Sequence, residues 1–191
     1  LEHCEFLADK QNYIENNHGT MMDKSLIVLA AFFQKKGKAY ESYNIGKERI
    51  LKAFNRDFSR KGVHLENSPS YHNMTKNMYL DIKRFLNEIG DSLGIEFERK
   101  LEKTEDYLAY ILKPNNEYPL IGDTTKGKIK AIKKKNGNFL DEEAGISVLQ
   151  GKNQFWLSFI AGYKRITHKH KDDLSITMFY NGEDILVDSG P

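Results

Sequence analysis

Residues 174–187, LSITMFYNGEDILV, place two strand-like runs on either side of Asn181-Gly182. Asn-Gly between such runs is a strong hairpin signal, because both residues accept the positive φ that a two-residue turn requires. Two further strand-like runs, 146–149 and 155–160, precede this hairpin. The C-terminal part of the chain is therefore predicted to form an antiparallel sheet.

The sequence before about residue 113 has helical periodicity. The run 26–33, LIVLAAFF, is apolar on every side and predicts a helix buried among other helices, with Thr20 and Asp23 as its capping box. A helix over about 41–58 carries one apolar stripe, which is typical of an outer layer. Helices followed by strands predict an α+β chain.

Two more helices are expected before the strands. Ser68-Pro69 fits an N-cap followed by proline at the first helical position. A last helix is expected from Thr104 to about residue 113, before Pro114. We therefore divide the chain into three ranges, namely helices, a turn-rich linker and strands: 1–113, 114–140 and 141–191.

Composition excludes several classes of protein. The 191 residues carry 29 Lys and Arg against 27 Asp and Glu, a net charge of +2, whereas a dedicated nucleic-acid binder needs a cationic excess. No apolar run approaches the roughly 20 residues that span a bilayer. Cys4 is the single cysteine, which excludes an internal disulfide. We expect it to be a buried thiol. Because the chain begins without Met and ends on Ser189-Gly190-Pro191, we expect a segment of a longer protein.

The first of three polar clusters is Asn16-Asn17-His18-Gly19. It has two interpretations. In one it is a loop at a helix end, where Asn and Gly are common. In the other, Asn17 and His18 are held rigidly and donate hydrogen bonds to a carboxylate.

The second cluster is 64–72, HLENSPSYH. It is either an N-cap with a packed tyrosine or a site in which Tyr71 lies near the positive end of a helix. A free phenol has a pKa near 10. A position at that helix end favours phenolate, which is the form that a general base requires.

The third cluster contains His168-Lys169-His170, with Asp188 further along the chain. It is either a solvated loop or the beginning of a zinc site. A regular two-residue hairpin turn would set Asp188 opposite Ser175, so a metal shared with His170 requires the loop to fold back. Six lysines within 126–135 are either a solvated linker or a patch that steers an anionic polymer.

Taken in order, these clusters resemble the heparinase II/III group of polysaccharide lyases, which includes heparinase III and related alginate and oligoalginate lyases. The resemblance covers about residues 10–191, including 62–72 and 187–190. It implies part of an incomplete α/α toroid followed by the start of an antiparallel β-sandwich, with the substrate cleft between them. It also implies cleavage of uronic-acid polysaccharides by β-elimination.

The resemblance assigns roles to the catalytic candidates. Asn17 and His18 would neutralise the uronate carboxylate, because the neighbouring C5 proton is very weakly acidic. Tyr71 would act as general base, general acid or both, and His168 as a second acid/base group. Three residues are expected to bind substrate: Asn16, Glu66 and His72.

The resemblance further implies a structural zinc ion, for which His170 and Asp188 would be two ligands and which would brace the loop of His168. The family completes this site with another histidine, beyond the last residue of this chain. The expected partner is an acidic polysaccharide or oligosaccharide, and a periplasmic or secreted location is implied. Two other functions are considered: a non-catalytic carbohydrate-binding or polysaccharide-biosynthesis accessory protein, and a hydrolase that uses a metal at His168, His170 and Asp188.

Overall fold

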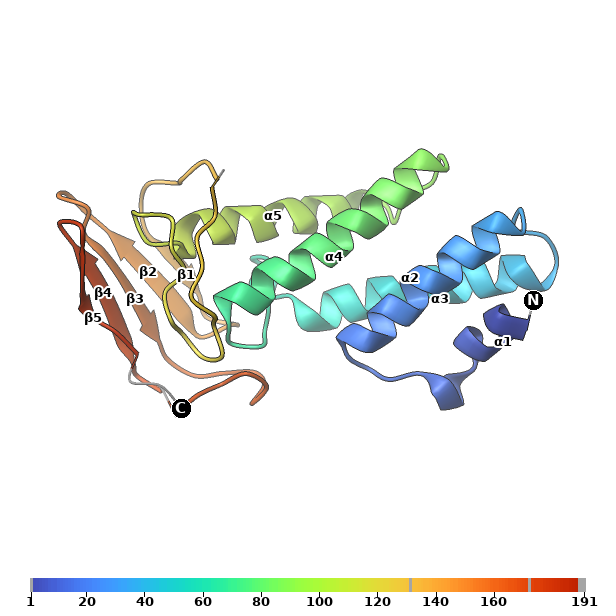
Figure 1. Cartoon of the computed structure of the whole chain (residues 1–191), viewed down its shortest axis with the longest axis horizontal. Coiled ribbons are helices and arrows are strands. Elements are labelled where there is room, and N and C mark those ends of the chain that lie inside the picture. Colours follow the sequence, from blue (N-terminus) through green and yellow to red (C-terminus); the bar gives the residue numbers. More distant parts are fainter. Residues whose placement is uncertain (1, 131, 172, 189–191) are drawn as a thin grey trace. The chain divides into compact units, whose positions relative to one another are not determined.

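A computed structural model describes residues 2–130, 132–171 and 173–188 of this chain. Helices come first and strands follow (Figure 1). The helical elements are α1 (Glu2–Ala8), the 3-10 helix η1 (Lys10–Asn12), α2 (Asn17–Phe32), α3 (Lys38–Asp57), α4 (Pro69–Glu88) and α5 (Ile95–Ile111). The strands are β1 (Phe139–Asp141), β2 (Ile146–Gln150), β3 (Trp156–Ile160), β4 (Ile176–Tyr180) and β5 (Glu183–Leu186). This order confirms the predicted α+β class. The expectation that the chain is a segment of a longer protein was drawn from Leu1 and Ser189-Gly190-Pro191, which lie outside the described residues.

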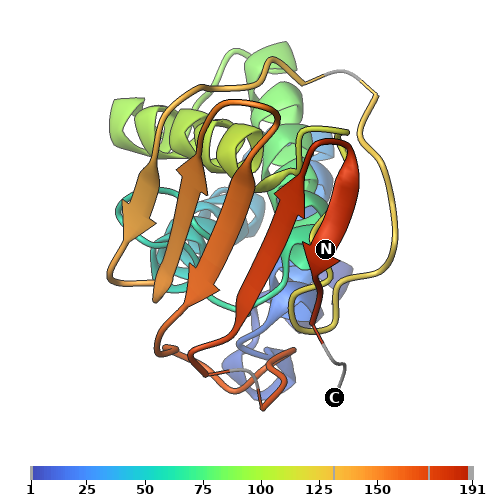
Figure 2. The same ribbon diagram turned by 90° about the vertical axis from the view of Figure 1, so that its left-hand side faces the viewer.

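Within the described ranges, the strands form one antiparallel sheet in the order β1-β2-β3-β4-β5, as Figure 2 shows. The predicted hairpin is confirmed, with φ of 49° at Asn181 and 94° at Gly182. Its register is irregular, because a bulge lies between Met178 and Phe179. The short strand β1 has no counterpart among the predicted runs.

The chain forms two compact units. Unit 1 comprises 1–56 and 78–98, and unit 2 comprises 57–77 and 99–191. Most of α5 and the first turns of α4 thus belong with the sheet. These units divide the chain differently from the three predicted ranges, because helix-to-strand order along the sequence does not determine which elements pack together.

The core of unit 1 contains an aromatic cluster. Phe54 of α3 lies with its ring centroid 4.7 Å from that of Tyr79 and 4.7 Å from that of Phe97. Leu26 and Ile27 of α2 are fully buried, as predicted, but Phe32 is 79% exposed. Among the described residues, α2 is therefore buried on one side and not on every side.

The cap of α2 differs from the predicted one. Asn16 is the N-cap, and its side-chain oxygen accepts hydrogen bonds from the backbone N–H groups of His18 (2.9 Å) and Gly19 (3.4 Å). Thr20 and Asp23 lie inside the helix and are fully buried, so the predicted capping box is wrong. A helix that begins at the Asn-rich loop satisfies its first N–H groups without them.

The last helix begins earlier than predicted. It starts at Ile95, directly after Gly94, whose φ is 92°. Thr104 lies within the helix, where its hydroxyl donates to the carbonyl of Leu101. Its hydroxyl thus bonds within the helix instead of capping it, which corrects the expected boundary.

The core of unit 2 lies between α5 and one face of the sheet. Buried side chains alternate along β3 and β4, as expected for a sheet with one covered face. Trp156, 1% exposed, donates its indole N–H to the carbonyl of Tyr110 at 3.0 Å. This core includes Tyr107, Leu108, Ile111, Ile146, Val148, Trp156, Ile160 and Phe179.

Two smaller expectations concern Cys4 and the membrane. Cys4 is a buried free thiol, as predicted. Over the described ranges, the helices lack the length and hydropathy that crossing a membrane requires.

A tyrosine and histidine site in unit 2

Two of the predicted catalytic residues meet in unit 2. Tyr71 lies in the first turn of α4, and His168 lies in the loop between β3 and β4. Their rings are stacked, with centroids 3.6 Å apart and planes inclined by 20°. A phenol and an imidazole distant in sequence are thus brought into direct contact.

The N-cap of α4 fixes the position of Tyr71. The hydroxyl oxygen of Ser68 accepts the backbone N–H of Tyr71 at 3.4 Å, which confirms the predicted cap. Ser68 also contacts the hydroxyl of Thr124 at 2.9 Å. The start of α4 is therefore connected to the segment before the sheet.

Two carboxylates flank the ring of His168. Asp123 Oδ2 lies 3.0 Å from Nδ1, and Glu66 Oε2 lies 3.7 Å from Nε2. Asp123 Oδ1 also lies 3.1 Å from Nε2 of His170. Hydrogen bonds from His168 and His170 lower the pKa of the Asp123 carboxyl. Both histidines of the His-x-His segment are thus connected through one aspartate.

Arg165 connects Glu66 to a buried aspartate. One guanidinium nitrogen lies 2.8 Å from Asp57 Oδ1 and 3.8 Å from Glu66 Oε1. Glu66 is buried, and its two oxygens face Arg165 and His168. Its predicted role in substrate binding stays a prediction, but its carboxylate already has cationic or polar neighbours.

Asn67 ties the HLENSPSYH segment to the loop of His168. Its φ is 57°, and its side-chain amide donates to the carbonyls of Arg165 (2.7 Å) and Thr167 (3.0 Å). Asparagine tolerates this left-handed conformation better than most residues with a side chain. Tyr71 and His168 are thus held on two segments that are directly hydrogen-bonded.

The two histidines of the HLENSPSYH segment, His64 and His72, are buried. His72 is 1% exposed, its Nδ1 accepts the backbone N–H of His64 (3.2 Å), and its Nε2 donates to the carbonyl of Thr104 (2.9 Å). Both ring nitrogens of His72 are engaged, so a substrate contact does not fit this position. His72 instead stabilises the loop before α4.

Burial also sets the charge state of both rings. It lowers the pKa of His64 and that of His72 to about 3 in each case. Both ring nitrogens of His64 are buried and lack a hydrogen-bond partner among the residues that the structure describes. These imidazoles are therefore neutral near pH 7.

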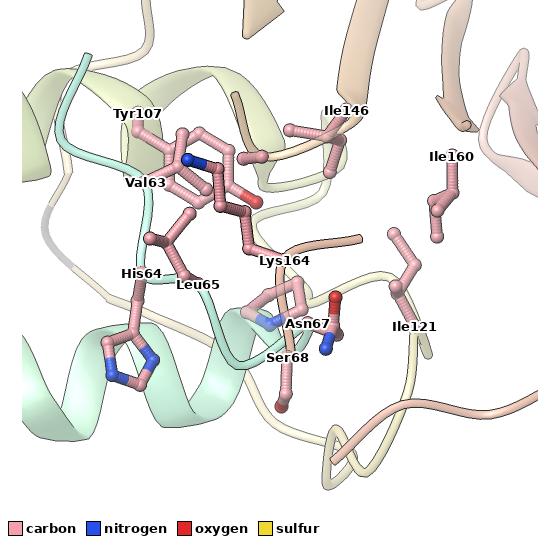
Figure 3. Close-up of a pocket in the computed structure, with 12 residues that line it drawn as sticks. Val63, His64, Leu65, Asn67, Ser68, Tyr107, Ile121, Ile146, Ile160 and Lys164 are labelled. Carbon is pink, nitrogen blue, oxygen red and sulfur yellow. The ribbon is translucent and has the colours of Figure 1, made fainter. Parts of the chain in front are cut away.

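A narrow crevice lies beside this segment (Figure 3). Its volume is about 20 Å³, which is room for about one water molecule and not for a sugar. Figure 3 shows Val63, Leu65 and Tyr107 on one side of it and Ile121 and Ile160 on the other. We therefore assign no substrate position to this crevice.

The loop does bring the two predicted metal ligands together. His170 Nδ1 lies 3.5 Å from Asp188 Oδ1, and this nitrogen is buried without a hydrogen-bond partner among the described residues. The pair fits one edge of a tetrahedral zinc site, because zinc binds the unprotonated imidazole nitrogen and a carboxylate. Over the described ranges, no group of three or more His, Cys, Asp or Glu side chains could hold a metal ion. Zinc stays a prediction.

The remaining predicted residues belong to unit 1. Asn16 caps α2, Asn17 is half-buried in the first turn and His18 is exposed. The first turn of α2 packs closely on the preceding chain, since a Cβ on Gly19 would collide with the carbonyl oxygen of Ile14. The loop and the helix start are thus well defined, while the functional roles of the three side chains stay predictions.

The lysine cluster has a mixed role. Lys134 donates to the carbonyls of Leu112 (2.6 Å) and Lys113 (2.5 Å) at the end of α5, and burial lowers its pKa to about 8. Lys135 pairs with Asp106 at 2.6 Å. The other four lysines of the cluster, Lys126, Lys128, Lys130 and Lys133, are exposed. Steering of an anionic polymer by these four stays a prediction.

Sequence reasoning missed Asp57, Asp123 and Arg165. The Gly122-Asp123 pair gives a turn signal, but a turn does not indicate which distant loop it contacts. Arg165 and Asp57 carry no motif of their own. Their contacts depend on packing across more than 100 residues of sequence, from Asp57 to Arg165.

Helices followed by an antiparallel sheet, with a tyrosine and a histidine stacked beside that sheet, define an α+β protein with a paired phenol and imidazole. Residues 1–143 match the family model Heparinase II/III N-terminus, and residues 134–191 match Heparinase II/III-like, C-terminal. The chain belongs to the heparinase II/III family. A comparison with curated proteins gives no match.

Solved structures share this fold. A crystal structure of heparinase III has a TM-score of 0.81 and 17% identity, over 99% of this chain and 37% of that one. The heparan sulfate lyase HepC from Pedobacter heparinus has a TM-score of 0.79 and 16% identity, over 98% of this chain and 34% of that one. The chain thus spans about a third of the length of these structures, and its helices and sheet match part of their toroid and the start of their sandwich.

Proposed function

We propose that this chain carries acid/base residues of a polysaccharide lyase that cleaves a uronic-acid-containing polysaccharide, heparan sulfate-like or alginate-like, by β-elimination. The observation that carries the proposal is the stacking of Tyr71 on His168, with Glu66 and Asp123 on either side of the imidazole. Membership of the heparinase II/III family and the likeness to a heparan sulfate lyase support it. For such an enzyme we also propose a periplasmic or secreted location.

The proposed reaction transfers one proton from carbon and one to oxygen. A base removes the C5 proton of the uronate, and the electron pair forms the C4–C5 double bond as the C4–O bond breaks. The leaving glycosidic oxygen then takes a proton. Tyr71 is proposed as base, acid or both, and His168 as the second acid/base group.

Neutralisation of the uronate carboxylate is the other requirement. Removal of the C5 proton develops charge on that carboxylate, so hydrogen-bond donors that strengthen in the transition state lower the barrier. We propose Asn17 and His18 as these donors, with Asn16 also near the substrate. Their place in the first turn of α2 supports the proposal, since a helix N-terminus favours negative charge.

A structural zinc ion is proposed for the His170 and Asp188 pair. When bound, it would fix the loop that carries His168. Support comes from the buried Nδ1 of His170, which faces Asp188 and has no hydrogen-bond partner among the described residues. Chelator treatment of the intact protein is expected to lower its melting temperature, with zinc found by metal analysis. Turnover that stops on chelation at unchanged stability, with saturated products, would favour a metal-dependent hydrolase instead.

The test of the main proposal is product analysis with the full-length protein on a panel of uronic-acid polymers. We expect new near-ultraviolet absorbance from unsaturated uronate ends. Tyr71→Phe is expected to lower the rate by at least about 100-fold with folding intact, because it removes the exchangeable proton. Tyr40→Phe, on the exposed surface of α3, is the matched control.

Two outcomes would contradict the proposal. Tyr71→Phe at full rate would overturn the role of Tyr71. Binding of uronate polymers in affinity electrophoresis without any cleavage would favour a non-catalytic carbohydrate-binding or biosynthetic accessory protein.

A further inference from the structure

The turn Gly122-Asp123, in the segment between α5 and β1, contacts the loop of His168 through three hydrogen bonds. The backbone N–H of Asp123 donates to the carbonyl of His168 at 3.1 Å. The side-chain oxygens of Asp123 accept from Nδ1 of His168 (3.0 Å) and Nε2 of His170 (3.1 Å). One residue thus holds His168 by its backbone and by its ring.

Gly122 allows this close approach. Its φ is 51°, and a Cβ at this position would lie 2.3 Å from the carbonyl oxygen of His168 and 2.6 Å from that of Asn67. Both neighbours are backbone atoms, so they cannot move aside as a flexible side chain would. The turn therefore fits against the loop only with glycine at position 122.

The loop of His168 needs external support. His168 itself has a φ of 56°, which is uncommon for a residue with a side chain. Asn67 fixes the residues before it, through the carbonyls of Arg165 and Thr167. The Gly122-Asp123 turn holds His168 itself and the histidine that follows.

We propose that Asp123 is a positioning residue for His168, seated by Gly122. A carboxylate that accepts from Nδ1 holds the proton on that nitrogen and leaves Nε2 to exchange protons. Asp123 also prevents rotation of the ring that stacks on Tyr71. The expected effect on catalysis rests on the proposed lyase function, whereas the effect on the ring does not.

The first test measures the ring directly. In the full-length protein with ring-15N-labelled histidine, His168 is identified by its loss in His168→Gln. We expect the Nδ1–H tautomer in the wild type and a mixture of tautomers in Asp123→Ala. Asp106→Ala is the control, because Asp106 is also a half-exposed, ion-paired aspartate of unit 2. An unchanged tautomer in Asp123→Ala would overturn the proposal, even if the protein had no lyase activity.

The second test is kinetic. Asp123→Ala is expected to lower kcat about 10- to 100-fold with KM changed less than about twofold, because the residue acts through His168 and not on the substrate. Gly122→Ala is expected to lower kcat similarly. Its control, Gly127→Ala, adds a Cβ no closer than 3.4 Å to any neighbour. Folding of each variant is checked by Trp156 fluorescence; a raised KM at unchanged kcat would contradict a positioning role.

Discussion

Burial shifts the pKa of a carboxyl in unit 1 and the pKa values of two imidazoles in unit 2. Unit 1 buries Asp23, and burial raises the pKa of this carboxyl to about 7, although nearby Tyr13 and Arg49 act in the opposite direction. Unit 2 buries His64 and His72, and burial lowers their pKa values to about 3. In each case burial favours the neutral form. The same physical effect therefore gives the two units opposite responses to pH.

The largest expected effect is the acid sensitivity of unit 2. Below pH 6.5 the unfolded chain binds protons at both histidines while the native unit does not, so stability is lost as the pH falls from 6.5 toward 3. At pH 5 the loss is about 2 kcal/mol for each histidine, or about 4 kcal/mol in total. Denaturant unfolding followed by Trp156, the single tryptophan and a residue of unit 2, measures it.

One substitution separates the histidines from other titrating groups. His64→Leu is expected to reduce the difference in stability between pH 7.5 and pH 5 by about 2 kcal/mol, because the ring of His64 has no hydrogen-bond partner among the described residues to lose. His3→Leu, at an exposed histidine of unit 1, is the control. If His64→Leu left the pH dependence of the free energy of unfolding unchanged, His64 would not contribute to the acid sensitivity of unit 2.

The second effect concerns Asp23 in unit 1. The native carboxyl keeps its proton to higher pH than the unfolded one, so stability is lost as the pH rises from about 4 to 7. Between pH 5 and 7 the loss is about 2 kcal/mol, and Asp23→Asn is expected to abolish it. Hydrogen exchange of α2 and α3 amides, corrected for intrinsic rates, measures it.

The exposed Asp81→Asn variant of α4 serves as its control, since Asp81 also lies in unit 1. If Asp23→Asn and Asp81→Asn showed the same pH dependence as the wild type, the contrast between the units would have another origin.

The smallest effect compares two helix caps. Ser68→Ala and Asn16→Ala are each expected to cost about 1 kcal/mol, because each removes an acceptor for backbone N–H groups. Ser68 also loses its contact with Thr124, so its cost should be the larger. Chemical denaturation of each variant checks the order. A rate defect in Asn16→Ala well beyond its loss of stability would support a role in substrate binding.

Local signals gave the correct prediction where neighbouring residues decide the structure. Asn181-Gly182 predicted the hairpin and Ser68-Pro69 predicted the start of α4, since both signals act over a few residues. The start of α5 was missed because the charged stretch after Gly94 forms helix without an apolar run to mark it. The cap of α2 was placed too late, since Thr20-x-x-Asp23 fits a capping box as well as a helix interior.

The site was predictable only in part. The HLENSPSYH and His-x-His segments indicated Tyr71 and His168 as candidates, and the structure brings their rings together. Asp123 and Arg165 could not be found in this way, because their importance comes from contacts with residues distant in sequence. His72 was assigned by its place in a motif, whereas its burial shows a supporting role.

The bulge in the β4–β5 hairpin limits how this sequence can vary. Because of the bulge, Leu186 pairs with Met178. Residues after the bulge therefore point to the face of the sheet opposite the one that they would occupy in a regular hairpin. Between residues 180 and 188, substitution should be costly at Asn181 and Gly182, which hold positive φ, and at Asp184, which pairs with Lys113. Insertion or deletion of a single residue there would turn Asp188 away from His170, so the length of this segment should be more restricted than its composition.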